Sequence, residues 1–218
     1  MKVITIANQK GGTGKSTIAA NLACVLANDK YKVLAVDSDI QSSLSDFHAI
    51  RTNKEITPIF STIKIVTPVI HKEIPKFENA FNIVIIDTGG RASALFTSAL
   101  SAADIVIIPI TPSPYDIWAS EETFKLCETV KTYKTNLEVY LLINMVIERT
   151  RVIKDLNSVL EEIVENYKFK IFNTQLHNLM IYKYAIDEGL SAYEKDKNNK
   201  AGNEFLQLYK EIKIIINK

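Results

Sequence analysis

Cysteine is scarce in this sequence, and glycine accounts for only 7 of its 218 residues. The two cysteines, Cys24 and Cys127, lie far apart, and neither belongs to a CxxC pair. A disulfide framework is therefore not indicated, which fits a reducing compartment. Each cysteine lies in an apolar helical stretch, where a thiol is expected to serve as a small buried core residue.

The sequence also lacks an excess of charge of one sign. Lysine and arginine total 26 and aspartate and glutamate 25, so a nucleic-acid site would have to be a local patch. No apolar run reaches the ~18 residues that a membrane span requires, and the N-terminus shows no signal peptide. These absences predict a soluble, cytoplasmic protein without a membrane segment.

Short apolar runs alternate with longer helical patterns along the chain. Continuous Val and Ile runs indicate strands covered on both faces, and their alternation with helices predicts βαβ units. We therefore expect an α/β fold, with residues 1–218 forming a single doubly wound domain whose mostly parallel sheet has helices on both faces. The expected strands are 2–7, 32–37, 81–87, 104–110, 138–146 and 169–173; the expected helices are 15–29, 41–50, 91–101, 117–132 and 151–167. Region 53–76 is expected to hold a short strand or two and an irregular crossover.

Three of the seven glycines lie in the stretch "ANQKGGTGKSTIAANLA", residues 7–23. It follows a buried strand and opens a helix, as a phosphate-binding loop does, and its end fits the pattern G-x-x-x-x-G-K-[ST]. Its first glycine is replaced by Gln9, and a second lysine, Lys10, follows. The glycines can turn backbone N–H groups toward a phosphate, while Lys15 supplies a cation and Ser16 a hydroxyl for Mg²⁺.

Polar residues also follow the other expected strands. Asp87 ends an apolar strand, which suits a carboxylate that holds Mg²⁺ through its water shell. Asp37 and Asp39 flank Ser38 after the second strand, where two carboxylates can orient a water or sense a γ-phosphate. Ligands bind outside the carboxyl ends of strands in doubly wound sheets, so these residues predict one site.

The segments "KGGTGKST", "VDSDIQSS" and "FNIVIIDTGG" resemble the deviant Walker A, A′ and B motifs of the ParA/MinD family of P-loop ATPases. The segment "PITPSPYDIWA" and the C-terminal end resemble short plasmid-type ParA proteins. The resemblance covers nearly the whole chain. It implies an ATP- and Mg²⁺-dependent homodimer in which Lys10 reaches the nucleotide of the other subunit, and it assigns water activation to Asp39.

The resemblance also extends the site toward the base, where Asn144 matches an adenine contact and Pro112 lies nearby. The expected catalytic residues are Lys10, Lys15 and Asp39, and the expected metal-holding residues are Ser16, Asp37 and Asp87. The expected nucleotide contacts are Lys10, Gly11, Gly12, Thr13, Gly14, Lys15, Ser16, Thr17, Pro112 and Asn144. The chain departs from the family at Ile40 and at Gly89-Gly90-Arg91, where many members have proline. Arg91 is open to two interpretations, a solvent residue at a helix start or a partner contact.

The first strand begins at residue 2, so the chain resembles the ParA type that lacks an N-terminal helix-turn-helix. The resemblance implies a nucleoid-associated ATPase that binds DNA nonspecifically as an ATP dimer. A ParB-like or other small centromere-binding partner would stimulate its weak hydrolysis. Candidate DNA contacts are Arg149, Arg151, Lys154, Lys183, Lys195, Lys197 and Lys200.

Four alternatives remain at this point. A MinD-like membrane-associated switch would use "NEFLQLYKEIKIIINK" as an amphipathic anchor, although a terminal helix packed on the sheet explains the same pattern. A small-molecule ligase disagrees with Lys10 and the two-acid motif. An iron–sulfur reductase lacks cysteines at strand ends. A nucleotide-gated scaffold without hydrolysis is compatible with the same motifs.

Overall fold

The computed structural model describes residues 1–57, 60–91, 93–147 and 153–217. Within them, seven parallel strands form one sheet in the order β3-β2-β4-β1-β5-β6-β7. The strands are β1 (Lys2–Ile6), β2 (Val33–Ser38), β3 (Ser61–Lys64), β4 (Ile83–Thr88), β5 (Ile105–Ile110), β6 (Glu138–Ile143) and β7 (Lys170–Ile171). The predicted α/β fold with a parallel sheet is confirmed.

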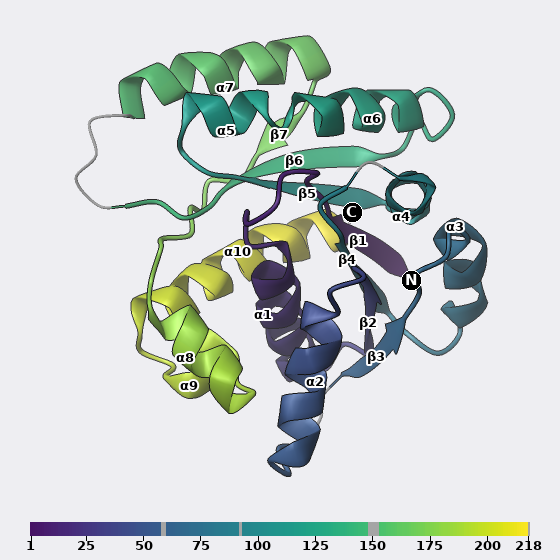
Figure 1. The fold of residues 1–218 in the computed structure, drawn as a ribbon, viewed down its shortest axis with the longest axis vertical. Coiled ribbons are helices and arrows are strands. Elements are labelled where there is room, and N and C mark those ends of the chain that lie inside the picture. The colour runs from purple at the N-terminus through teal and green to yellow at the C-terminus, as the bar shows by residue number, and fades with distance from the viewer. Residues whose placement is uncertain (58–59, 92, 148–152, 218) are drawn as a thin grey trace.

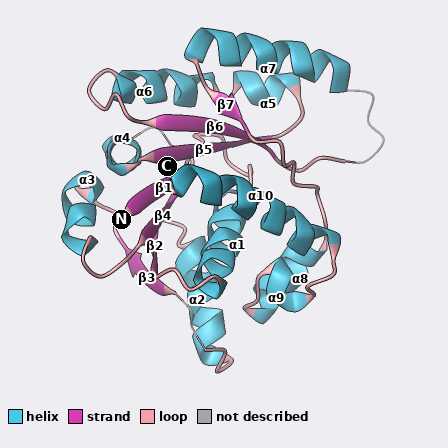
Figure 2. Cartoon of the chain, turned by 180° about the vertical axis from the view of Figure 1, so that it is seen from behind, coloured by secondary structure: helices cyan, strands magenta, loops and turns pink. Residues whose placement is uncertain are grey.

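Helices cover both faces of this sheet (Figures 1 and 2). One layer consists of α1 (Lys15–Asn28), α2 (Ser43–Asn53), α8 (Ile181–Glu188), α9 (Ala192–Lys195) and α10 (Lys200–Ile216). The other consists of α3 (Ile70–Glu73), the 3₁₀ turn η1 (Ile74–Phe77), α4 (Ala94–Ala102), α5 (Pro114–Trp118), α6 (Glu121–Lys131) and α7 (Ile153–Tyr167). The sheet is therefore doubly wound, as predicted.

Alternate residues of each central strand enter different halves of the core. In β4, Ile83 and Ile85 pack with α1 and α10, whereas Val84 and Ile86 pack with α3 and α4. All six residues of β4 are buried. Because successive side chains of a strand point to opposite faces, both sets of side chains in this strand meet the core, which explains the continuous Val/Ile run over residues 83–86.

Several expected elements have different bounds in the structure, three of them in the second half of the sheet and its helices. Region 117–132 is interrupted between α5 and α6, where the Ser120 hydroxyl donates to the Asp116 carbonyl at 2.9 Å and accepts from the Asn8 amide at 2.9 Å. The strand expected over 138–146 ends at Ile143. Met145 has a positive φ of 59°, which is not a strand conformation, so the chain turns away from the sheet there. The strand expected over 169–173 is reduced to the two residues of β7. Region 53–76 contains β3 and a crossover through α3, as expected.

The C-terminal helix α10 packs against α1 in the core. Its apolar residues Phe205, Leu208, Ile212 and Ile215 are all buried there. The interpretation of this segment as a terminal helix packed on the sheet is confirmed, and the apolar face that an anchor would use is covered. Within the described part of the chain, no helix is both long and apolar enough to cross a membrane.

A buried ion pair joins α2 to α9 in the helical layer that contains α1. The guanidinium of Arg51, on α2, is 1% exposed; it donates to the Gly189 carbonyl and to Glu194, both at 2.8 Å. Glu194 also closes a capping box with Ser191 at the start of α9. Burial alone would raise the pKa of Glu194, but Arg51 and Ser191 together hold this pKa below its usual value.

Replacing Arg51 with alanine is expected to lower the free energy of unfolding by about 3–5 kcal/mol, because it leaves the Glu194 carboxylate partly buried without its cation. Urea unfolding measures this. The matched control is Lys195→Ala, which removes a solvent-exposed pair with Glu188 and should cost less than about 1 kcal/mol. Because the folded-state pKa of Glu194 is lowered, its contribution is present above its unfolded pKa and is lost as the pH falls through the folded value. Equal effects of the two substitutions would contradict this account.

Candidate functional site

The carboxyl ends of five strands meet at one edge of the sheet. Ile6 of β1 lies beside Asp87 of β4, and Asp37 of β2 lies beside Asp87 on its other side. On the opposite side of β1, Ile110 of β5 lies beside Ile143 of β6. The connection after β1 leads to β2 on one side of it, whereas the connection after the adjacent β4 leads to β5 on the other side. The glycine loop that follows β1 therefore lies at the switch point where ligands bind in such sheets.

A cavity of about 870 Å³ opens at this edge. Seven of the predicted site residues line it: Gly11, Gly12, Gly14, Lys15, Ser16, Thr17 and Asp39. The lining does not include the remaining predicted residues, which are Lys10, Thr13, Asp37, Asp87, Pro112 and Asn144. Arg91 lines the cavity, whereas α4 begins at Ala94 with Ser93 as its cap, so Arg91 does not occupy the helix start.

The glycine loop has the backbone of an anion-binding turn. Gly12 and Gly14 have φ values of 74° and 84°, a region that other residues enter only with strain. Gly14 is the N-cap of α1 and supplies no side-chain cap, so the first N–H groups of this helix have no side-chain acceptor. Such a helix start, with no acidic residue in its first turn, fits a phosphate group.

Two lysines lie at the loop and point to different partners. The Lys15 ammonium is buried and donates to the Lys10 carbonyl at 3.1 Å. Burial lowers the pKa of Lys15, while the nearby Asp87 and Asp39 carboxylates raise it. The Lys10 ammonium forms an ion pair with Asp116 of α5. Sequence reasoning did not identify Asp116, because nothing in the sequence places α5 beside the loop.

The three predicted acids have different environments. Asp37 accepts three hydrogen bonds. One comes from the Asp39 backbone N–H at 3.1 Å, and two come from the backbone N–H and the hydroxyl of Ser45, at 2.8 and 2.7 Å. Asp37 thus caps α2, and its role as a metal holder stays a prediction. Asp39 accepts from the Gln41 backbone at 3.0 Å and faces Gly89, where an added Cβ would lie 3.2 Å from its oxygen.

Asp87 is the acid whose environment points to a cation. It is 0% exposed, and neither of its oxygens has a hydrogen-bond partner of ordinary geometry. Burial raises the pKa of Asp87 to about 7, with the Asp37 and Asp39 carboxylates adding to the shift and Ser16 and Lys15 opposing it. A buried carboxylate that lies near the Ser16 hydroxyl but accepts no hydrogen bond of ordinary geometry fits Mg²⁺, which usually takes one or two protein ligands plus phosphate and water.

No cluster of three or more acidic, histidine or cysteine side chains able to hold a metal by itself occurs in the described ranges. A metal here would therefore depend on oxygens from a bound phosphate.

Asn144 and Thr13 join the loop to β6. The Asn144 amide, buried at the end of β6, donates to the Thr13 carbonyl at 2.7 Å. In this arrangement Asn144 supports the loop, and its predicted contact with adenine stays a prediction, as does that of Pro112. Arg149 and Arg151 lie outside the described residues, as does the side chain of Lys154.

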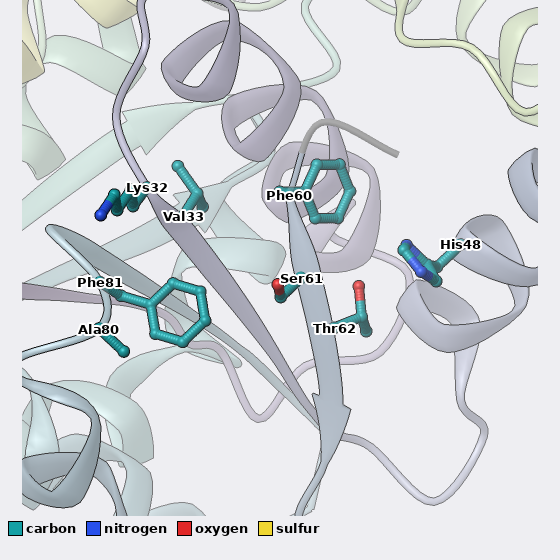
Figure 3. A pocket seen from close by; sticks show the side chains of 8 residues that line it. All are labelled: Lys32, Val33, His48, Phe60, Ser61, Thr62, Ala80 and Phe81. Carbon is teal, nitrogen blue, oxygen red and sulfur yellow. The ribbon is translucent and has the colours of Figure 1, made fainter. Parts of the chain in front are cut away.

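A second cavity, of about 550 Å³, lies at the opposite ends of β2 and β3 (Figure 3). It is lined by Lys32, Val33, His48, Phe60, Ser61, Thr62, Ala80 and Phe81. None of the predicted site residues lines it, so the chemistry identified from the sequence belongs to the cavity at the glycine loop.

Comparisons with known proteins identify the family of this chain. Residues 4–213 match the family described as the CobQ/CobB/MinD/ParA nucleotide binding domain. The chain is 25% identical to the maintenance of carboxysome distribution protein A of Halothiobacillus neapolitanus, over 96% of this chain and 95% of that protein. It is 24% identical to a virulence plasmid ParA family protein of Chlamydia psittaci, over 97% and 94% of the two chains.

The fold resembles that of solved structures as well. The septum site-determining protein MinD of Pyrococcus horikoshii, complexed with Mg-ADP, superposes with a TM-score of 0.75 over 97% of this chain and 95% of that one, at 17% identity. At this identity the likeness concerns the fold alone. The glycine loop, the cavity and the strand-end acids of the present chain lie on that shared fold.

Proposed function

The chain belongs to the CobQ/CobB/MinD/ParA family of nucleotide-binding domains, and from this premise we propose that it is a ParA-type positioning ATPase that partitions plasmid or chromosomal DNA. Two ATP-bound copies form a dimer that binds DNA nonspecifically. A ParB-like or other small centromere-binding partner stimulates weak hydrolysis, which releases the dimer. The observation that carries the proposal is that the phosphate loop contains a second lysine, Lys10, in addition to Lys15.

The residues of the site have separable tasks in this proposal. The glycine loop and the start of α1 hold the phosphates, with Lys15 as the nearby cation. Ser16 and Asp87 would hold Mg²⁺, which supplies charge neutralisation at the phosphates when bound. Asp39, at the cavity wall, is assigned to orient the attacking water. Hydrolysis by such a site depends on position and electrostatics rather than on a covalent intermediate.

The candidate DNA contacts that the structure describes lie on or next to α8, α9 and α10, at one end of the molecule (Figure 1). Lys183 is exposed, Lys195 pairs with Glu188, and Lys197 lies over the Tyr193 ring. If these lysines contact phosphates, binding should weaken steeply as salt rises. Glu188 partly neutralises the charge of Lys195, so we expect Lys195 to contribute little to DNA binding by one subunit.

The proposal is tested by co-sedimentation with nonspecific duplex DNA and, separately, with anionic liposomes, each with ATP·Mg²⁺ and with ADP. ATP-dependent binding to DNA that is lost at high salt is the expected result. ATP-dependent binding to liposomes alone would overturn it in favour of the MinD-like alternative. Release of phosphate in the same samples distinguishes an ATPase from a nucleotide-gated scaffold.

Replacing Lys10 with alanine is expected to abolish the ATP-dependent dimer while a single subunit still binds nucleotide within about threefold of the wild type. The reason is that two triphosphates facing each other need more positive charge than one loop provides. Light scattering with ATP measures the dimer, and calorimetry measures nucleotide binding. The comparison is Lys15→Ala, which should lose nucleotide binding itself. A Lys10→Ala variant that dimerises normally with ATP would contradict the proposal that Lys10 contacts the nucleotide of the other subunit.

A further inference from the structure

The ammonium of Lys10 is engaged within its own chain. It forms an ion pair with one carboxylate oxygen of Asp116, and the other oxygen accepts from the Thr111 hydroxyl. The Lys10 and Asp116 side chains are 26% and 30% exposed, so the pair lies at the rim of the loop, within reach of solvent and of a second molecule. The Lys10 hydrogen bond, followed by that of Thr111, holds the pKa of Asp116 below its usual value.

Helix α5 holds Asp116 firmly in this place. The Asp116 carbonyl accepts from the Ser120 hydroxyl at 2.9 Å, and Ser120 in turn accepts from the amide of Asn8, which belongs to the loop that carries Lys10. The Asn8 amide also donates to the Pro109 carbonyl of β5 at 2.9 Å. The loop and α5 therefore form one hydrogen-bonded unit, and the ion pair closes it on the outside.

We propose that Asp116 is a latch that holds Lys10 in its own subunit, and that ATP-dependent dimerisation with a second copy of this chain must open one latch in each subunit. This inference rests on the proposed function, in which Lys10 acts on the partner's nucleotide. The side chain of Lys10 extends in one direction at a time, so pairing with Asp116 competes with that role. Asp116 is a regulatory residue here, and it touches neither nucleotide nor water in the reaction.

The size of the effect follows from the exposure of the pair. Partly exposed ion pairs favour the paired state by a small factor, about threefold. A dimer contains two latches, so the factors multiply to about tenfold in the dissociation constant of the dimer. A latch of this strength restrains dimerisation at low nucleotide without preventing it at high nucleotide.

The test is Asp116→Asn, which keeps the shape of the side chain and a hydrogen-bonding oxygen but removes the charge. The matched control is Glu122→Gln, which removes one negative charge from the exposed face of the adjacent α6. Two quantities are measured for each: the labelling rate of Lys10 by an amine-reactive reagent in nucleotide-free protein, followed by mass spectrometry, and the dimer dissociation constant with ATP·Mg²⁺, from light scattering.

For Asp116→Asn we expect Lys10 to be labelled about threefold faster and the dimer to be about tenfold tighter, with both values unchanged in Glu122→Gln. If Asp116→Asn leaves the labelling rate of Lys10 unchanged, or weakens the ATP dimer, the proposal that Asp116 restrains Lys10 is overturned. This holds even if the wild type dimerises with ATP. Faster labelling in a protein whose wild type forms no ATP dimer would instead overturn the proposed function and the regulatory role together, while leaving the contact itself established. Calorimetry with ADP checks that nucleotide binding by one subunit is retained.

Discussion

Replacing Gly14 with alanine is expected to reduce nucleotide affinity at least about 100-fold and to lower the free energy of unfolding by about 2–4 kcal/mol. Gly14 has a φ of 84°, and an added Cβ would lie 2.5 Å from the Asn144 amide nitrogen. That amide donates to the Thr13 carbonyl, so it cannot retreat without breaking the bond that supports the loop. Titration calorimetry with an ATP analogue and urea unfolding measure the two effects.

Two further variants separate the causes of this effect. Gly11→Ala is the matched control for stability, because a Cβ there meets nothing within 4 Å and needs no positive φ. It should change the free energy of unfolding by no more than about 0.5 kcal/mol. Adding Asn144→Ala to Gly14→Ala removes the collision, but it leaves the backbone strain and removes the hydrogen bond to Thr13, so it should restore only part of the stability. Wild-type stability in Gly14→Ala alone would contradict the described loop conformation.

Replacing Asp87 with asparagine is expected to have opposite effects on two properties. The nucleotide-free protein should become more stable at pH 8 by roughly 2–4 kcal/mol, because a buried charge without hydrogen-bond partners is removed. The affinity for nucleotide in the presence of Mg²⁺ should fall at least about tenfold, because the proposed metal-holding carboxylate is lost. Urea unfolding at pH 8 and calorimetry with and without Mg²⁺ measure these effects.

The pH dependence of stability identifies the charge on Asp87 as the cause. The pKa of Asp87 is about 7 in the folded protein against an ordinary value of 3.8, so between these values the folded state holds a proton that the unfolded state has released. The free energy of unfolding should therefore fall as the pH rises from about 4 to 7 and level off above. Asp87→Asn should lack this fall, whereas Asp187→Asn, at an exposed position of α8, should retain it. A Asp87→Asn variant less stable than the wild type at pH 8 would contradict an uncompensated buried charge.

Much of the fold could be predicted from the sequence, because its signals are local. A continuous apolar run such as that of β4 indicates a strand covered on both faces, and the parallel connections then bring strand ends to one edge. The loop with Gly12 and Gly14 was predicted for the same reason, since glycine is the residue that enters positive φ without strain. Helical spacing likewise predicted the buried face of α10.

The pairing of side chains across the fold could not be predicted in this way. Asn144 supports Thr13 from 131 residues away, and Arg51 meets Glu194 from 143 residues away. Between α5 and α6, Ser120 accepts a hydrogen bond from Asn8, which reaches it only once β1 and β5 are neighbours. No local pattern around Asp116 distinguishes it from a solvent-exposed acid.

The sequence by itself determined the strands, the glycine loop and the set of polar residues at the strand ends, because periodicity and backbone preference are properties of neighbouring residues. Only the tertiary structure decided what each polar group contacts: that Asp37 caps α2, that Asp87 accepts no hydrogen bond of ordinary geometry, and that Lys10 is paired with Asp116. These outcomes depend on which helix the crossovers place beside each strand end. Contact and desolvation act through space, so they are fixed only when the chain has folded.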